Sequence, residues 1–104
     1  MAKTTGAKLF AEIMQGYGIT HIFYVPQVVS KALVAMEDMP IRRVVAHSEK
    51  AAGYMADGYA RARRAPGVCM AQPIGASNLA SGLRDAYMAR SPVIASVGSP
   101  TISA

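Results

Sequence analysis

Glu49 is the residue of this sequence best placed for acid–base chemistry. It follows an apolar, strand-like run at 41–46 and opens an alanine-rich stretch that predicts a helix to about Ala62. Ser48 can cap that helix, and the helix dipole favours a carboxylate in its first turn. In an apolar cleft, burial would raise the pKa of Glu49, which could then donate or share a proton at neutral pH. From position alone, a helix-end charge that adds only a few tenths of a kcal/mol to stability is the favoured alternative.

The segment Gly-Ala-Ser-Asn at 75–78 is a second candidate. Gly75 permits close backbone approach, and Ser77 or Asn78 can cap a helix that we predict from about Asn78 to Ala89. Polar groups at such a helix start can face a ligand, but an ordinary cap is slightly favoured by the spacing alone. Neither GxGxxG nor GxxxxGK[ST] occurs in the sequence, which disfavours the usual nucleotide sites.

The side chains that could ligate a metal are scattered. His21 and His47 have no partners at ligand spacing, so we expect no metal site. His47 could assist a site at a strand end, whereas His21 falls near a strand start, away from such a site. The single cysteine, Cys69, cannot form an intrachain disulfide and is expected in the core. This usage fits a reducing compartment, and we expect the protein in the cytoplasm.

Composition fits one small α/β domain. The chain has 104 residues, 52% of them apolar, and a net charge of +5. Because the basic residues are mostly scattered, a solvated surface is favoured over a nucleic-acid patch. No signal peptide is apparent, and no apolar run approaches the ~20 residues of a membrane span. The high apolar fraction suggests an additional apolar surface, either a subunit interface or the cut face of something larger.

Alternating helices and strands must position the candidate groups. Helices are predicted at 4–15, 28–37, 49–62 and 78–89, and strands at 20–25, 41–46, 68–71 and 92–97. The first helix should bury Leu9, Phe10, Ile13 and Met14, and the fourth Leu79, Leu83 and Tyr87. This order predicts a three-layer α/β/α fold with a mainly parallel sheet. Ligands of such sheets bind beyond the C-terminal strand ends, where segments 24–27, 47–49 and 72–78 should converge.

Five sequence landmarks occur in a specific order and at specific separations. They are the run Gly-Ile-Thr-His-Ile-Phe-Tyr-Val-Pro at 18–26, the helix with Glu49, Ala52 and 55–61, the strand opening at 66–69, the loop 75–79 followed by Gly82-Leu83, and the strand opening at 92–94. Together they resemble the N-terminal, pyrimidine-binding (PYR) domain of thiamine-diphosphate-dependent enzymes of the acetolactate synthase, benzoylformate decarboxylase and pyruvate oxidase type. The resemblance runs from about Lys8 to Gly98.

The resemblance implies a catalytic role for Glu49. In this family the corresponding glutamate bonds N1′ of the cofactor's aminopyrimidine and thereby activates thiamine diphosphate for attack on a 2-keto acid. It also implies cofactor contacts from Val25, Pro26, Gly75 and Asn78. The family holds the diphosphate through Mg²⁺ on a separate domain, whose Gly-Asp-Gly…Asn motif this sequence lacks. A partner chain with that domain, or a homo-oligomer, is therefore implied.

Departures from the family pattern leave a second interpretation open. Gln27 and Val28 replace the usual glycines after the Val-Pro turn, Pro73-Ile74 replaces Gly-Pro, and Ser48 stands where a histidine often does. These changes suggest an altered substrate-side loop. The chain also ends after its fourth strand, as an incomplete PYR-type domain would, and we expect it to be inactive alone. The alternative is a non-catalytic fragment or small subunit that dimerises through the Glu49 helix.

Overall fold

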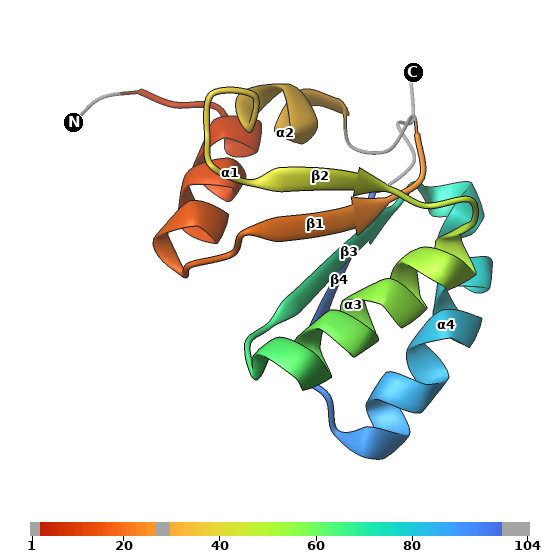
Figure 1. Ribbon diagram of the computed structural model, residues 1–104. Coiled ribbons are helices and arrows are strands. Elements are labelled where there is room, and N and C mark those ends of the chain that lie inside the picture. The colour runs from red at the N-terminus through yellow and green to blue at the C-terminus, as the bar shows by residue number, and fades with distance from the viewer. Residues whose placement is uncertain (1–2, 27–29, 99–104) are drawn as a thin grey trace.

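The computed structural model describes residues 3–26 and 30–98. Four parallel strands form one sheet in the order β2-β1-β3-β4. The elements, shown in Figure 1, are α1 (Gly6–Gly16), β1 (His21–Tyr24), α2 (Ser30–Ala35), β2 (Arg42–Val45), α3 (Glu49–Arg63), β3 (Gly67–Ala71), a 3₁₀ turn η1 (Pro73–Gly75), α4 (Ala76–Ala89) and β4 (Val93–Val97). The predicted α/β/α architecture with a parallel sheet is confirmed.

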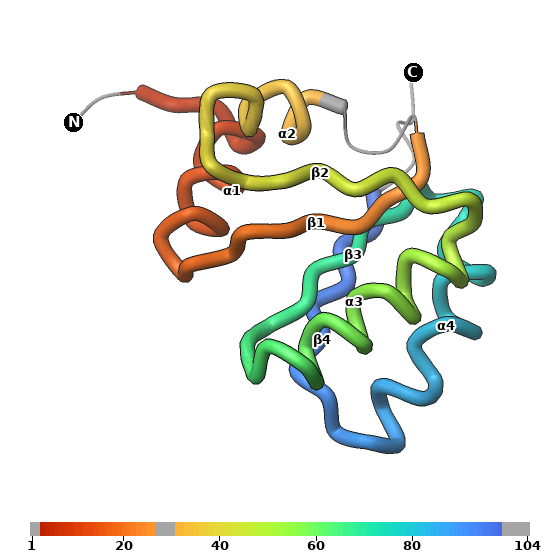
Figure 2. Tube along the Cα trace, in the orientation of Figure 1, coloured from red at the N-terminus to blue at the C-terminus, as the bar shows by residue number. Residues whose placement is uncertain are grey.

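The helices cover the sheet in two layers. Helices α1 and α2 pack against one another on one side, whereas α3 packs against α4 and against β1, β3 and β4. Figures 1 and 2 show these two helix pairs on opposite sides of the twisted sheet. Such a split follows from right-handed crossovers, because the chain moves outward from β1 to β2 and then back across to β3.

Strand β3 forms the centre of the core. All five of its residues are buried, as expected for a parallel strand that is covered on both faces. Cys69 lies in the middle of this strand with no exposed area, and burial raises the pKa of its thiol to about 11. The predicted core position of Cys69 is therefore confirmed.

Small residues let α3 approach its neighbours closely. A Cβ on Gly53 would lie 3.1 Å from the backbone carbon of Gly82, and a Cβ on Gly82 would collide with the Lys50 carbonyl oxygen. A Cβ on Gly67 would likewise collide with the Ala56 carbonyl oxygen. The alanine- and glycine-rich sequence of α3 thus allows backbone-to-backbone packing, which places the start of α3 beside the start of α4.

Two predicted buried faces are partly wrong. In α1 the buried side chains are Ala11 and Met14, while Leu9 and Ile13 are 47% and 42% exposed, because the helix contacts the protein along a narrow stripe. In α4 the buried positions are Leu79, Gly82 and Ala86. Tyr87, predicted to be buried, is 79% exposed, because contact with α3 through Gly82 rotates it away from the core.

The predicted element boundaries differ from the observed ones by a few residues. Helix α4 begins at Ala76, two residues early, because η1 leads directly into it. Helix α2 is shorter than predicted and spans Ser30–Ala35, while predicted positions 28 and 29 lie outside the described residues. No helix in the described ranges has the length and apolarity needed to cross a bilayer.

Candidate functional site

The C-terminal edge of the sheet brings Glu49, Gly75 and Asn78 together. Strand β2 ends at Val45, and α3 starts four residues later at Glu49. Ser48 fixes this start, because its hydroxyl oxygen accepts a hydrogen bond of 3.1 Å from the backbone N–H of Ala51. The predicted cap is confirmed, and it aims the first side chain of α3 toward the segment that follows β3.

A hydrogen bond joins the two helices at this edge. The Nδ2 amide of Asn78 donates to Oε1 of Glu49 at 2.9 Å. Asn78 lies inside α4 and is not its cap, because Gly75 occupies the N-cap position and no side chain caps this helix. The prediction that Ser77 or Asn78 caps α4 is therefore wrong, and Asn78 instead orients the Glu49 carboxylate.

Gly75 makes room for that carboxylate. A Cβ at this position would lie 2.6 Å from Oε2 and 2.6 Å from Cγ of Glu49. Because ordinary van der Waals contact begins at about 3.4 Å, any side chain at position 75 would displace the carboxylate from its bond with Asn78. The requirement for glycine here comes from space and not from backbone conformation, since its φ is −83°.

The ionisation of Glu49 differs from the prediction. Its bond from the Asn78 amide, and secondly a bond from its own backbone N–H, hold the pKa of this carboxyl below its ordinary value. Burial acts in the opposite direction but is the smallest contribution. The predicted rise in pKa is thus wrong for this chain, because Glu49 is only half-buried. At neutral pH it is a carboxylate that accepts hydrogen bonds.

Two other predicted site residues, Val25 and Pro26, lie at the same edge of the sheet. Val25 and Pro26 follow β1, which lies between β2 and β3, and they are half-buried and exposed respectively. Gln27 falls outside the described residues. His47 is exposed two residues before Glu49. His21 begins β1 at the opposite edge, as predicted, where its ring lies near Tyr59 and its Nδ1 is 2.9 Å from Oγ1 of Thr20.

Sequence reasoning missed an ion pair on α3 in which the carboxylate is buried and the arginine is exposed. Asp57 is 5% exposed and accepts two hydrogen bonds from Arg61, from Nε at 2.9 Å and from Nη2 at 3.0 Å. This pair holds the pKa of Asp57 below its ordinary value, with a smaller contribution from the Ser91 hydroxyl. The signal in the sequence was the (i, i+4) spacing of opposite charges within the predicted helix. Both residues of the pair lie in α3, so the ion pair spans one turn of this helix.

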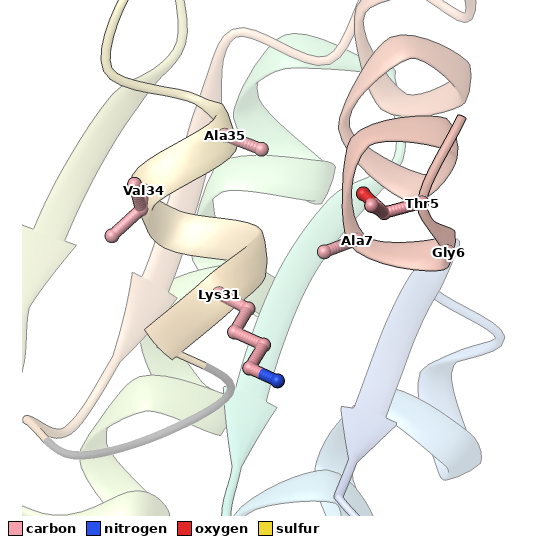
Figure 3. Close-up of a pocket in the computed structure, with 6 residues that line it drawn as sticks. All are labelled: Thr5, Gly6, Ala7, Lys31, Val34 and Ala35. Atoms are coloured by element: carbon pink, nitrogen blue, oxygen red, sulfur yellow. The ribbon is translucent and has the colours of Figure 1, made fainter. Parts of the chain in front are cut away.

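A hollow lies on the other side of the sheet, between α1 and α2. It has a volume of about 570 Å³ and is lined by Thr5, Gly6, Ala7, Lys31, Val34 and Ala35. Figure 3 shows Ala7 of α1 and Ala35 of α2 directed into the space between the helices. Glu49 does not line this hollow. Among residues 3–26 and 30–98, no three His, Cys, Asp or Glu side chains are grouped as metal ligands.

Comparison with known sequences identifies related proteins. The family model described as "Thiamine pyrophosphate enzyme, N-terminal TPP binding domain" matches residues 4–104. The chain is 35% identical over 96 residues to acetolactate synthase 2, chloroplastic, of Nicotiana tabacum, a match that covers 89% of this chain and 14% of that protein. It is 35% identical over 100 residues to the acetolactate synthase of Bacillus subtilis, covering 94% of this chain and 18% of that protein. The chain therefore spans less than a fifth of the length of these relatives.

Solved structures share the fold. A candidate thiamin diphosphate-dependent enzyme from Mycobacterium smegmatis matches with a TM-score of 0.83 and 25% identity, covering 95% of this chain and 19% of that one. Benzoylformate decarboxylase from Polynucleobacter necessarius matches with a TM-score of 0.76 over 94% of this chain and 19% of its own. At 22% identity, the second comparison concerns the fold alone.

Proposed function

Because the chain belongs to the thiamine pyrophosphate enzyme N-terminal domain family, we propose that it forms the pyrimidine-binding part of a thiamine-diphosphate site. In this proposal Glu49 is the catalytic carboxylate of a 2-keto-acid decarboxylase or carboligase. The observation that supports it best is the position of Glu49 at the C-terminal sheet edge, held by Asn78 over Gly75. Ligands of parallel α/β sheets bind at this edge.

The residues at this edge fit an aminopyrimidine. Asn78 donates to Oε1 of Glu49 and thereby orients the side chain, while the absence of a Cβ on Gly75 leaves the space in which the carboxylate lies. At neutral pH Glu49 is a carboxylate, which can accept a charge-assisted hydrogen bond from a protonated nitrogen of such a ring. When bound, thiamine diphosphate supplies the carbanion and electron-sink chemistry.

The remaining parts of the proposed site come from elsewhere. Glu49, Val25, Pro26, Gly75 and Asn78 would contact the pyrimidine, and none of them is a phosphate or Mg²⁺ site. We propose that a separate domain, on a partner chain or on a longer polypeptide, holds the diphosphate and its Mg²⁺. Isolated, the 104-residue chain would then bind the pyrimidine weakly and catalyse nothing. The cytoplasm remains the expected location.

Nuclear magnetic resonance on the 104-residue chain tests this role. Thiamine, which carries the aminopyrimidine without the diphosphate, should shift the backbone amide signals of Gly75 and Asn78. Substitution of Glu49→Gln should weaken this binding at least tenfold, because a neutral amide accepts a weaker bond from the ring. Glu37→Gln, at an exposed position after α2, is the matched control. Equal binding by the Glu49→Gln and control chains would contradict the proposal, as would shifts confined to other elements.

An assembly role is the second candidate, and one observation favours it. On α3, the Glu49 helix, the adjacent Tyr54 and Met55 are 45% and 41% exposed, and contiguous exposed apolar side chains can mark an interface. A chain that dimerises through this helix would lose its self-association on substitution of Met55→Lys. Thiamine binding and self-association are separate measurements, so each candidate can fail independently.

A further inference from the structure

Thr20, His21 and Tyr59 form a hydrogen-bonded network, here the His21 network, at the sheet edge opposite Glu49. The Tyr59 hydroxyl oxygen lies 2.7 Å from Oγ1 of Thr20, and that oxygen lies 2.9 Å from Nδ1 of His21. Tyr59 belongs to α3, whereas Thr20 and His21 stand where β1 begins. One shared hydroxyl group therefore joins a titratable ring on the sheet to a phenol on the helix.

The surrounding contacts hold the three groups of the His21 network in place. The Thr20 carbonyl accepts a hydrogen bond of 2.7 Å from the N–H of Arg42, so strand pairing fixes the Thr20 backbone. The ring centroids of His21 and Tyr59 are 5.1 Å apart, and the Tyr59 ring also makes an edge contact with Phe23 at 5.9 Å. The Thr20 hydroxyl hydrogen can still turn, because its rotation moves no heavy atom.

Two arrangements of hydrogen atoms satisfy both bonds of the His21 network. When the imidazole is neutral with its hydrogen on Nε2, Nδ1 accepts from the Thr20 hydroxyl, and Thr20 in turn accepts from the Tyr59 hydroxyl. When the imidazole is protonated, both ring nitrogens donate, so Nδ1 donates to Thr20. The Thr20 hydroxyl can then turn its single hydrogen toward the Tyr59 oxygen. Both bonds persist in this second arrangement, but each has the opposite direction.

The charged neighbours of His21 are cations. Arg42 of β2 pairs with His21 in register, so both side chains lie on the face of the sheet that α3 covers. On α3, Arg63 lies one turn beyond Tyr59, and β3 carries no charged residue. In the part of the chain that the structure describes, no carboxylate is ion-paired with His21. The Thr20 oxygen is thus the acceptor beside a protonated Nδ1.

We propose that the His21 network is a pH-dependent switch, in which protonation of His21 reverses both hydrogen bonds and turns the Tyr59 hydroxyl hydrogen away from Thr20. One proton is taken up from solvent onto Nδ1, while each hydroxyl group keeps its own hydrogen and only rotates. Imidazoles ordinarily change charge between about pH 5 and pH 8, so the switch operates in this range. On its acidic side, half-buried Tyr59 gains a free donor on α3, which a carbonyl or carboxylate oxygen can accept.

Nuclear magnetic resonance of the 104-residue chain tests the switch. The ¹³Cζ signal of Tyr59, which reports the bonding of its hydroxyl, should move together with the His21 ring signals between about pH 8 and pH 5. The ¹⁵N signals of the neutral ring should show its hydrogen on Nε2. His47→Gln leaves His21 as the single histidine and should preserve both results. A Tyr59 signal that stays constant while His21 is protonated would overturn the proposal, as would a neutral ring with its hydrogen on Nδ1.

Substitutions at Thr20 separate the hydrogen bonds from direct contact between the two rings. Thr20→Val removes the hydroxyl at nearly constant shape, so Tyr59 should lose most of its response while His21 is still protonated. Thr20→Ser retains a hydroxyl and should keep the response, and Thr4→Val, at an exposed position, is the matched control. The amide spectrum of each variant confirms that it is folded. An undiminished Tyr59 response in folded Thr20→Val would assign that response to ring contact and overturn the proposal.

Discussion

At the level of single residues, the site depends on a polar contact between two helices that begin at the same sheet edge. The Asn78 amide donates to the Glu49 carboxylate, and Gly75 leaves the space in which that carboxylate lies. Asn78 thereby sets both the orientation of Glu49 and the direction of its pKa shift. A side chain that stabilises the ionised form of an acid lowers its affinity for a proton, so the group remains a carboxylate at neutral pH.

Removal of the amide should reverse that shift. In Asn78→Ala the pKa of Glu49 should rise toward its ordinary value, because the largest cause of its lowering is lost. A ¹³C titration of the Glu49 side-chain carboxyl, followed by nuclear magnetic resonance, measures this. Ser77→Ala, at the exposed preceding position of α4, should leave the titration unchanged. An unchanged Glu49 titration in Asn78→Ala would show that Asn78 does not engage the carboxylate in solution.

At the level of elements, glycines in helices α3 and α4 set how closely the two helices pack. Gly53 and Gly82 face one another, and a Cβ added at Gly82 would collide with the Lys50 carbonyl oxygen. A backbone group cannot rotate aside as a side chain can, so the helices must separate to admit a methyl group. Separation would also move Asn78 away from Glu49, which links this packing to the site.

Gly82→Ala should therefore lower the free energy of unfolding by about 1–3 kcal/mol, in spite of the better helix propensity of alanine. Gly58→Ala is the control, because it lies in the interior of α3 with open space around its Cβ position. That substitution should raise the free energy of unfolding by roughly 0.5–1 kcal/mol. Urea denaturation measures both, and equal effects of the two substitutions would refute close packing at Gly82.

The sequence predicted these elements well where a local pattern decides them. Alternation of apolar runs with amphipathic stretches placed every strand within one residue at each end, and Ser48 marked the start of α3. The start of α4 was missed because η1 leads into it without a side-chain cap. Tyr87 was misplaced because the rotation of α4 depends on Gly82 and α3, which lie far away in the sequence.

The candidate site was predictable only where a local sequence pattern marks its residues. Glu49 and Gly75 stand at element junctions, and motif resemblance singles them out together with Asn78. The bond between Asn78 and Glu49 joins residues 29 positions apart, so no local pattern could reveal it. The direction of the Glu49 pKa shift depends on this bond, and the sequence-based prediction of that direction was consequently wrong.

At the level of the whole molecule, the two lowered carboxyl pKa values make the fold sensitive to acid. The Arg61 guanidinium lowers the pKa of Asp57 in the folded state, and Asn78 lowers that of Glu49. A carboxyl whose pKa is lower when folded stabilises the fold above its unfolded pKa, near 4. That contribution is lost as the pH falls through the folded pKa.

Stability should thus fall below about pH 4, and Asp57→Asn should flatten this dependence. At pH 7 the same variant should be less stable by about 1–3 kcal/mol, because the charge-assisted bonds from Arg61 to the buried carboxylate are weakened. Thermal unfolding from pH 3 to pH 7 measures both effects. Asp38→Asn, in the exposed loop after α2, should change neither. If stability depended on pH in Asp57→Asn as it does in the unmodified chain, the ion pair would not be the cause of that dependence.

The position of Cys69 at the centre of β3 makes the labelling rate of its thiol a measure of how often the sheet opens. The thiol has no exposed area and a pKa near 11, so a labelling reagent finds almost no reactive thiolate while the sheet is closed. Modification must await an opening that frees β3 from both helix layers, and its rate then follows the population of the open chain. The labelling rate of this one native thiol thus reports the population of chains in which the whole sheet is open.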